Sequence, residues 1–271
     1  MSLSDKEGNQ IMKWLLTLCL LLLGGSLHAA EWQESAKVAE LFKKAGVEGT
    51  FVLYDVKADR MTGYNQMRAQ TRLVPASTFK IPNSLIGLST GTVKSVDEVL
   101  PYGGKPQPYP QWERDMGLRD AIVMSNVPIY QELARRIGLE QMQQGVTKLG
   151  YGNQQIGTIV DRFWLDGPLK ISAIEQAQFL AKLAQGTLPL DADVQKTVRE
   201  IVQLEKNDQW TLYGKTGWEN APGAGTGWWV GWVEKDGRVY SFALNVAVRV
   251  KEDGDKRVPL GKESLQALGV L

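Results

Sequence analysis

The spacing of hydrophobic and polar positions changes along the 271-residue chain. Apolar residues recurring at helical intervals predict helices at 31–45, 129–137, 139–149, 172–184, 191–204 and 262–268. Runs rich in β-branched and aromatic residues predict strands at 49–55, 59–64, 210–215, 227–233 and 238–248. The last two strands are expected to form a hairpin across Lys235-Asp236-Gly237. We expect a loop at 65–74 and irregular structure in the Gly- and Pro-rich stretch 87–111.

This order of elements predicts an α+β fold. Strands occur at both ends and helices fill the middle, so we expect one antiparallel sheet made from both termini and packed by helices. The helical middle would form a second lobe, with a cleft between the lobes as the natural place for a site. Residues 31–271 contain no repeat and no long linker, which favours a single domain.

The first 30 residues have a different character. Met12-Lys13 gives a positive start, an apolar run of about ten residues follows, and small residues end at Ala29 and Ala30. This pattern predicts a cleaved signal peptide, with residues 1–11 as a leader or an alternative start. The apolar run is short for a bilayer span, so we expect no stable membrane association; a membrane anchor is the alternative.

The amino-acid composition limits which catalytic groups and metal ligands the mature chain can use. The single cysteine, Cys19, and the single histidine, His28, both lie in the predicted leader. The mature chain would therefore lack thiol nucleophiles, disulfides, Ser-His-Asp triads and His or Cys metal sites. A general base must then be Asp, Glu, Lys, Tyr or an amino terminus. A net charge of +1 without a basic stripe also makes nucleic acid an unfavoured partner.

One short stretch contains a candidate nucleophile and base. Ser77 lies in the first turn of an expected buried helix, and Lys80 follows three residues later, so both side chains share a face. A serine hydroxyl needs a base within hydrogen-bond reach. Phe79 and Ile81 would provide apolar surroundings that lower the pKa of the lysine. The alternative is a capping serine and a surface lysine.

Two further motifs follow in the chain. Gly214-Lys215-Thr216-Gly217 ends a predicted strand, where Lys215 and the Thr216 hydroxyl offer donors and Gly217 permits close packing. The alternative is a simple strand-end turn. Ser125 stands at a loop-to-helix junction, where the alternative is an N-cap. The ordered set of Ser-x-x-Lys, Ser-x-Val and Lys-Thr-Gly is much more specific than any one of the three motifs.

The chain resembles the class D, or oxacillinase-type, serine β-lactamases. The matching segments are Ser77-Thr78-Phe79-Lys80, Ser125-Asn126-Val127, Tyr151-Gly152-Asn153, Phe163-Trp164-Leu165, Lys215-Thr216-Gly217 and 227–232. They extend over nearly the whole mature chain. The resemblance implies a β-lactamase/transpeptidase-like fold, hydrolysis of β-lactam antibiotics, resistance to them, and secretion to the periplasm of a Gram-negative bacterium.

The resemblance also implies roles for individual residues. Ser77 would be the acylated nucleophile, and Lys80, carbamylated by carbon dioxide to N6-carboxylysine, would be the general base. Ser125 would relay a proton to the leaving lactam nitrogen. The Trp164 indole N–H would donate to the carbamate. No metal is expected, and no cofactor other than carbon dioxide or bicarbonate.

Other residues would shape the site. Phe79, Val127, Trp164 and Leu165 would form its apolar wall, and Tyr151 and Asn153 would support it. Lys215, Thr216 and Gly217 would hold the substrate carboxylate, and the backbone N–H groups of Ser77 and Trp218 would form the oxyanion hole. The partner is a small-molecule β-lactam; the spectrum of substrates and the choice between monomer and homodimer remain open.

The sequence departs from the family pattern at one position. An arginine near the start of the last helix often binds the β-lactam carboxylate, but Gly261 stands where that arginine would fall. Arg257, Lys262 or Arg249 are the possible substitutes, unless Lys215 and Thr216 suffice. Two other functions remain as alternatives: a cell-wall transpeptidase or D,D-carboxypeptidase, and a β-lactam sensor that stays acylated.

Overall fold

A seven-stranded sheet organises the computed structural model, which describes residues 30–219 and 225–271. Its strand order is β1-β3-β2-β7-β6-β5-β4. The strands are β1 (Glu31–Glu34), β2 (Gly49–Asp55), β3 (Arg60–Tyr64), β4 (Gln203–Lys206), β5 (Trp210–Trp218), β6 (Gly225–Lys235) and β7 (Arg238–Val248). Strand β2 pairs antiparallel with β7, Gly49 lying opposite Val246. The sheet therefore combines the two ends of the domain, as predicted.

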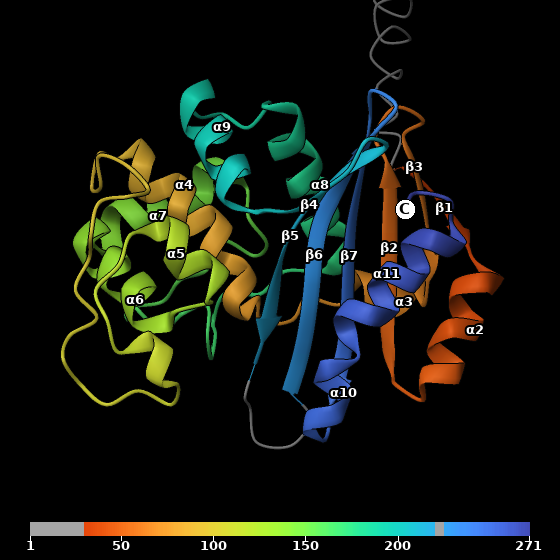
Figure 1. Cartoon of the computed structure of the whole chain (residues 1–271), viewed down its shortest axis with the longest axis horizontal. Coiled ribbons are helices and arrows are strands. Elements are labelled where there is room, and N and C mark those ends of the chain that lie inside the picture. Colours follow the sequence, from red (N-terminus) through yellow and green to blue (C-terminus); the bar gives the residue numbers. More distant parts are fainter. Residues whose placement is uncertain (1–29, 220–224) are drawn as a thin grey trace, which may run out of the picture. The chain divides into compact units, whose positions relative to one another are not determined.

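Helices cover the sheet and form a group beside it (Figure 1). They are α2 (Ala36–Ala45), α3 (Gln66–Gln70), α4 (Lys80–Ser89), α5 (Leu118–Val123), α6 (Val127–Ile137), α7 (Leu139–Leu149), α8 (Ala173–Gln185), α9 (Ala192–Ile201), α10 (Lys251–Asp255) and α11 (Arg257–Ala267), with 3-10 helices η1 (Ala76–Phe79) and η2 (Pro110–Trp112). Helices α4 to α7 lie together on one side of the sheet. The predicted α+β fold with a mostly helical lobe is confirmed.

The main core lies between the sheet and helices α2 and α11. Phe42 from α2 and Leu260 from α11 pack against Trp229 and Phe242 of the sheet. Burying each such side chain stabilises the fold by about 1.5–3 kcal/mol. Helix α8 contacts β2, β6 and β7 as well. Within residues 30–219 and 225–271, every helix falls short of the length and apolarity that a membrane crossing requires.

Two predictions in the N-terminal part were wrong. The helix predicted at 31–45 begins at Ala36, because Ser35 is its N-cap and accepts a hydrogen bond from Val38 N–H at 3.3 Å. The residues before it form β1. The loop predicted at 65–74 contains the short helix α3, which Asn65 caps from a left-handed backbone conformation. Residues 1–29, most of the predicted leader, lie outside the described part.

The C-terminal part needed three corrections. The helix predicted at 191–204 ends at Ile201, and the chain continues as edge strand β4. The helix predicted at 262–268 begins earlier, at Arg257, after the short α10. Strands β5 and β6 extend beyond their predicted bounds. The hairpin was correct: Asp236 and Gly237 have φ of 52° and 68°, which suits a type I′ turn between β6 and β7.

Candidate active site

The site is centred on Ser77 and Lys80. Ser77 lies in η1, and Lys80 is the first residue of α4. Lys80 Nζ donates to Ser77 Oγ at 2.8 Å. The preceding Ala76 is buried with φ of 48°, a left-handed conformation that costs an alanine about 1–2 kcal/mol. Strain of this kind is maintained by the surrounding packing and fixes the direction of the serine.

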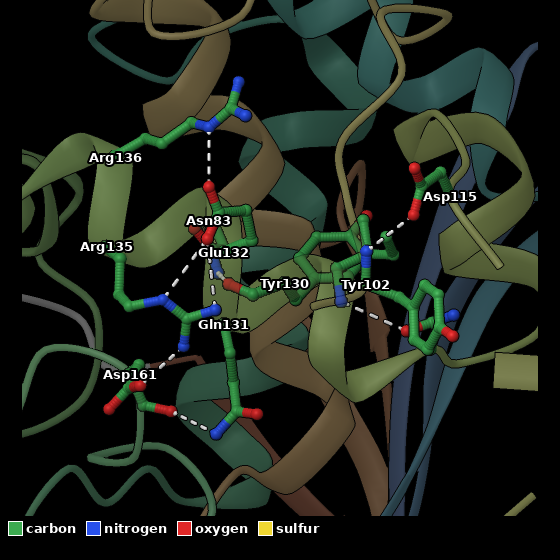
Figure 2. A network of polar contacts seen from close by, with 11 residues as sticks. Asn83, Tyr102, Asp115, Tyr130, Gln131, Glu132, Arg135, Arg136 and Asp161 are labelled. Carbon is green, nitrogen blue, oxygen red and sulfur yellow. Dashed lines mark hydrogen bonds and ion pairs between the residues drawn. The ribbon is translucent and has the colours of Figure 1, made fainter. Parts of the chain in front are cut away.

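Lys80 is held in an apolar interior. Its side chain is 1% exposed, and burial, helped by the positive charge of Lys215, lowers the pKa of the amine well below its ordinary value. The Tyr130 ring lies 5.3 Å from Lys80 Nζ. Tyr130 is itself held by its hydroxyl, 2.8 Å from Ser84 Oγ, and by its carbonyl, which accepts from Asn83 Nδ2 (Figure 2). A neutral amine beside Ser77 can accept a proton, which an ammonium cannot.

Aromatic side chains from a second segment form the wall of this interior. Phe79 stacks on Trp164, with ring centroids 5.6 Å apart, and meets Phe163 edge-on at 5.0 Å. Trp164 is fully buried. Its Nε1 has no hydrogen-bond partner among the described residues, which is costly for a buried donor. The site therefore contains a free N–H in an apolar chamber.

Supporting contacts explain the Tyr-Gly-Asn motif. The Tyr151 ring meets Phe79 edge-on at 5.7 Å, and its hydroxyl donates to Gln176 Oε1 at 3.3 Å. Gln176 Nε2 donates in turn to Thr78 Oγ1 at 2.8 Å, beside the nucleophile. Asn153 lies further away, where its side chain bonds the Pro168 carbonyl at 3.0 Å. Tyr151 thus supports the serine turn, whereas Asn153 closes the loop that holds Trp164.

Ser125 reaches the site by an unusual backbone conformation. Its φ is 53°, and its N–H donates to the Ile122 carbonyl at 3.2 Å. The N-cap of α6 is the next residue, Asn126, which accepts from Ile129 N–H at 3.1 Å. The N-cap alternative for Ser125 is therefore wrong. Its side chain lines the cavity that Ser77 also lines.

Strand β5 forms the opposite wall. A side chain at Gly217 would meet the Pro75 carbonyl at 2.9 Å, so glycine allows the strand to approach the serine turn. Glu219 N–H donates to Thr226 of β6, and Gly214 N–H to Val202 on the other side. Because N–H groups alternate in direction along a strand, the Trp218 N–H faces away from β6. Among the described residues it has no hydrogen-bond partner, so it is available to a ligand at this edge.

A cavity of about 720 Å³ joins these parts. Seven predicted site residues line it: Ser77, Ser125, Val127, Leu165, Thr216, Gly217 and Trp218. Lys80, Phe79, Trp164, Tyr151 and Lys215 are buried beside it. Pro108 and Tyr109, from the stretch expected to be irregular, line it as well, and so does Trp112 just after that stretch. The structure thus brings the predicted residues together, except for Asn153.

The three basic residues named as substitutes for the family arginine differ in whether they can reach a ligand in the cavity. Lys262 pairs with Glu205 and does not line the cavity. Arg249 lines it, but its guanidinium is 2.6 Å from Glu48. Arg257 lines the cavity, lies 4.9 Å over the Trp218 ring and has a buried Nε without a partner among the described residues. Arg257 is therefore the cation best placed for an anionic ligand.

Gly261, the residue that stands where the family arginine would fall, is not part of the cavity lining. It is buried on α11 beneath Trp229, and a side chain at this position would collide with that indole at 2.2 Å. An arginine at 261 has no space. Arg257, one turn earlier on the same helix, provides a guanidinium at the cavity.

The lowered pKa of Lys215 predicts that activity depends on pH near neutrality. Burial, followed by the charge of Arg257, lowers the pKa of Lys215 from 10.5 to about 7. Its ammonium is therefore lost from the free enzyme as the pH rises through about 7. We expect kcat/KM for carboxylate-bearing β-lactams to fall above that pH, measured as a pH–rate profile of initial velocities. Lys215→Arg keeps its charge and should abolish the fall. If kcat/KM of Lys215→Arg still falls above about pH 7, the titration of Lys215 is not its cause.

The chain matches the family described as "Penicillin binding protein transpeptidase domain" over residues 49–266. One curated relative is "Beta-lactamase OXA-5" of Pseudomonas aeruginosa, 42% identical over 226 residues, with 82% of each chain covered. Another is "Beta-lactamase OXA-48" of Klebsiella pneumoniae, 38% identical over 245 residues, covering 90% of this chain and 92% of that one.

Solved structures agree with the curated relatives. FUS-1 (OXA-85), a class D β-lactamase from Fusobacterium nucleatum subsp. polymorphum, is 44% identical and has a TM-score of 0.85. It covers 88% of this chain and 100% of its own. A class D β-lactamase from Nostoc is 37% identical, covers the same shares and has the same TM-score. The chain belongs to the class D serine β-lactamase family.

Proposed function

We propose that the chain hydrolyses the amide bond of β-lactam antibiotics through an acyl-Ser77 intermediate and so confers resistance to them. The observation that supports this most directly is the buried Lys80 amine, 2.8 Å from Ser77 Oγ. The cavity in front of Ser77 is open to a drug-sized molecule. The related proteins are named as β-lactamases, which makes β-lactams the proposed substrate class.

We further propose that Lys80 works as N6-carboxylysine, formed with carbon dioxide or bicarbonate. Two observations fit this modification. Burial lowers the pKa of Lys80 and so favours the neutral amine that reacts with carbon dioxide. Trp164 Nε1 is a buried donor that has no hydrogen-bond partner in the described part of the chain. When present, the carbamate supplies an anionic oxygen that accepts a proton from a hydroxyl or a water. Trp164 would hold it, and Phe79 would keep water away.

The residues of the chain account for the remaining steps. Ser77 Oγ attacks the lactam carbonyl carbon, and the carbon–nitrogen bond of the ring breaks. Ser125 passes a proton to the departing nitrogen. The backbone N–H groups of Ser77 and Trp218 stabilise the oxyanion, an effect worth about 2.7–4 kcal/mol per donor in other enzymes. A water then cleaves the ester and restores Ser77.

Arg257, with Lys215 and Thr216, is proposed to bind the substrate carboxylate. Arg257→Ala should raise KM for carboxylate-bearing substrates about tenfold with little change in kcat, because a charge-assisted contact is worth about 1.5 kcal/mol. Steady-state kinetics measure this. Arg249→Ala is the matched control, since Arg249 lines the same cavity but pairs with Glu48. An equal rise in KM in Arg257→Ala and Arg249→Ala would contradict a specific role for Arg257.

Turnover tests the function as a whole. The purified mature chain should hydrolyse a chromogenic cephalosporin many times per site, faster with added bicarbonate. Intact mass after penicillin treatment should show the unmodified protein once the drug is consumed. A single stoichiometric burst with a lasting adduct on Ser77 would instead indicate a transpeptidase or a sensor, both of which use the same nucleophile.

We also propose export to the periplasm, directed by residues 1–30. The supporting observation is the positive start, the apolar run and the small-residue end of this segment. N-terminal sequencing of the exported protein should find a start close to Glu31. A start at Met1 or Met12 in the mature protein would overturn the proposal.

A further inference from the structure

The loop that contains Trp164 has few polar attachments. Asn153 closes its base, through its own side chain and through Lys170 N–H, which donates to Asn153 Oδ1 at 3.0 Å. Leu169 N–H donates to the Phe163 carbonyl at 3.2 Å within the loop. Among the described residues, the hydrogen bonds that join residues 156–167 to segments outside the loop come from two side chains of α6. Trp164 Nε1 itself makes no hydrogen bond there. The position of the indole therefore depends on packing and on this attachment.

Both α6 side chains hold Asp161. Gln131 Nε2 donates to the Asp161 carbonyl at 3.0 Å, and Arg135 Nη1 contacts its carboxylate at 2.8 Å (Figure 2). Gln131 and Arg135 are one turn apart, so they act from the same face of the helix. Asp161 is three residues before Trp164. The attachment thus fixes both the backbone and the side chain of a residue close to the indole.

Glu132 orients the arginine. Its carboxylate lies 3.1 Å from Arg135 and 2.8 Å from Arg136. Burial raises the pKa of Glu132, but the hydrogen bonds from Arg136 and Arg135 outweigh it and keep the pKa below its ordinary value. Glu132 is therefore an anion at neutral pH, and Arg135 is held between two carboxylates.

The same helix also contacts the lysine. Tyr130, next to Gln131 in sequence, places its ring 5.3 Å from Lys80 Nζ. One side of α6 thus packs against Lys80. Another side holds Asp161 through Gln131 and Arg135 (Figure 2). Because both contacts come from the same helix, α6 sets the position of the indole N–H relative to the amine.

We propose that Gln131 and Arg135 are positioning residues, which clamp Asp161 and so keep the Trp164 N–H in place for the modified lysine. The inference rests on the proposed carbamylation of Lys80. Breaking the clamp leaves the chemical groups intact but widens the range of positions that the indole occupies. The carbamate then loses part of its donor and reverts more readily to free amine and carbon dioxide.

The test compares Arg135→Ala with two matched variants. Arg136→Ala removes a neighbouring arginine that also pairs with Glu132 but does not touch the loop. Arg162→Ala removes an ion pair within the loop, to Asp166. The quantity measured is the bicarbonate concentration that gives half-maximal activity. We expect it to rise by up to about fivefold in Arg135→Ala, the upper end of the range for an ion pair whose side chains are 45% and 25% exposed.

The double variant Gln131→Ala, Arg135→Ala should need about tenfold more bicarbonate than the wild type, and Arg135→Lys should recover part of the loss. Saturating bicarbonate should restore kcat, which a merely unfolded fraction would not allow. Hydrogen exchange of a peptide covering 156–167 should increase in Arg135→Ala and stay unchanged in Arg136→Ala.

The outcomes separate the inference from the proposed function. A wild-type protein without bicarbonate dependence and without a carbamate signal in ¹³C NMR overturns the lysine modification and the inference together. A wild-type protein with both, but the same bicarbonate requirement in Arg135→Ala as in Arg136→Ala, overturns the inference alone. Faster loop exchange without any change in bicarbonate requirement also counts against it.

Discussion

Replacing Lys80 by alanine is expected to lower β-lactam turnover by about 10²–10⁴-fold, the usual contribution of a general base. The structure gives the reason, because Lys80 Nζ is the group bonded to Ser77 Oγ, at 2.8 Å. Any acyl-Ser77 that does form should then persist, since water also needs a base. Stopped-flow kinetics and intact mass after penicillin measure the two effects.

The matched control for this variant is Lys182→Ala, an exposed lysine on α8. It should behave like the wild type. Added bicarbonate should not rescue Lys80→Ala, because no amine remains to be modified. A Lys80→Ala protein that deacylates at the wild-type rate would refute the role of the lysine as base.

The second large effect concerns Trp164. Trp164→Phe keeps an aromatic ring stacked near Phe79 but removes the one N–H donor of this side chain. A hydrogen bond to a charged group is worth about 1.5–3 kcal/mol, so the bicarbonate concentration for half-maximal activity should rise about 10–100-fold. Titration of activity with bicarbonate in carbon dioxide-depleted buffer measures it.

Trp232→Phe serves as the comparison for this experiment. Trp232 is an equally buried indole on β6, but its ring stacks on Tyr213 and its N–H donates to Glu234. It should alter stability without altering the bicarbonate requirement. If Trp164→Phe is fully active in depleted buffer, the indole is not the donor that the carbamate needs.

The Ser77 and Lys80 pair could be predicted because it is local. Three residues of helix bring the two side chains together whatever the rest of the chain does. Strands rich in β-branched and aromatic residues, such as β2 and β7, were also predicted close to their true bounds. Contacts across the fold were not accessible in this way. Gln176, which joins Tyr151 to Thr78, has no sequence signal that distinguishes it from other polar helix residues.

The helix ends explain the remaining errors. The predicted last helix starts at 262 and leaves Arg257 outside it, and Gly261 stands where the family arginine would fall. In the structure the helix begins at Arg257, and the packing of Trp229 on Gly261 fixes its face toward the sheet. The N-cap alternative for Ser125 failed because its neighbour Asn126 is the cap, and Ser125 lines the cavity as a predicted site residue.

The pairing of β2 with β7 has a consequence for how the protein becomes active. It joins Gly49 to Val246, so the central ladder closes only after almost the whole domain has been synthesised, and such long-range contacts form slowly. Before that moment Ser77 and Lys80 are close only in sequence, because an isolated turn of helix is unstable in water. A lysine in an unfolded chain is a hydrated ammonium with its ordinary pKa. The burial that lowers the pKa of Lys80 therefore arises together with the fold.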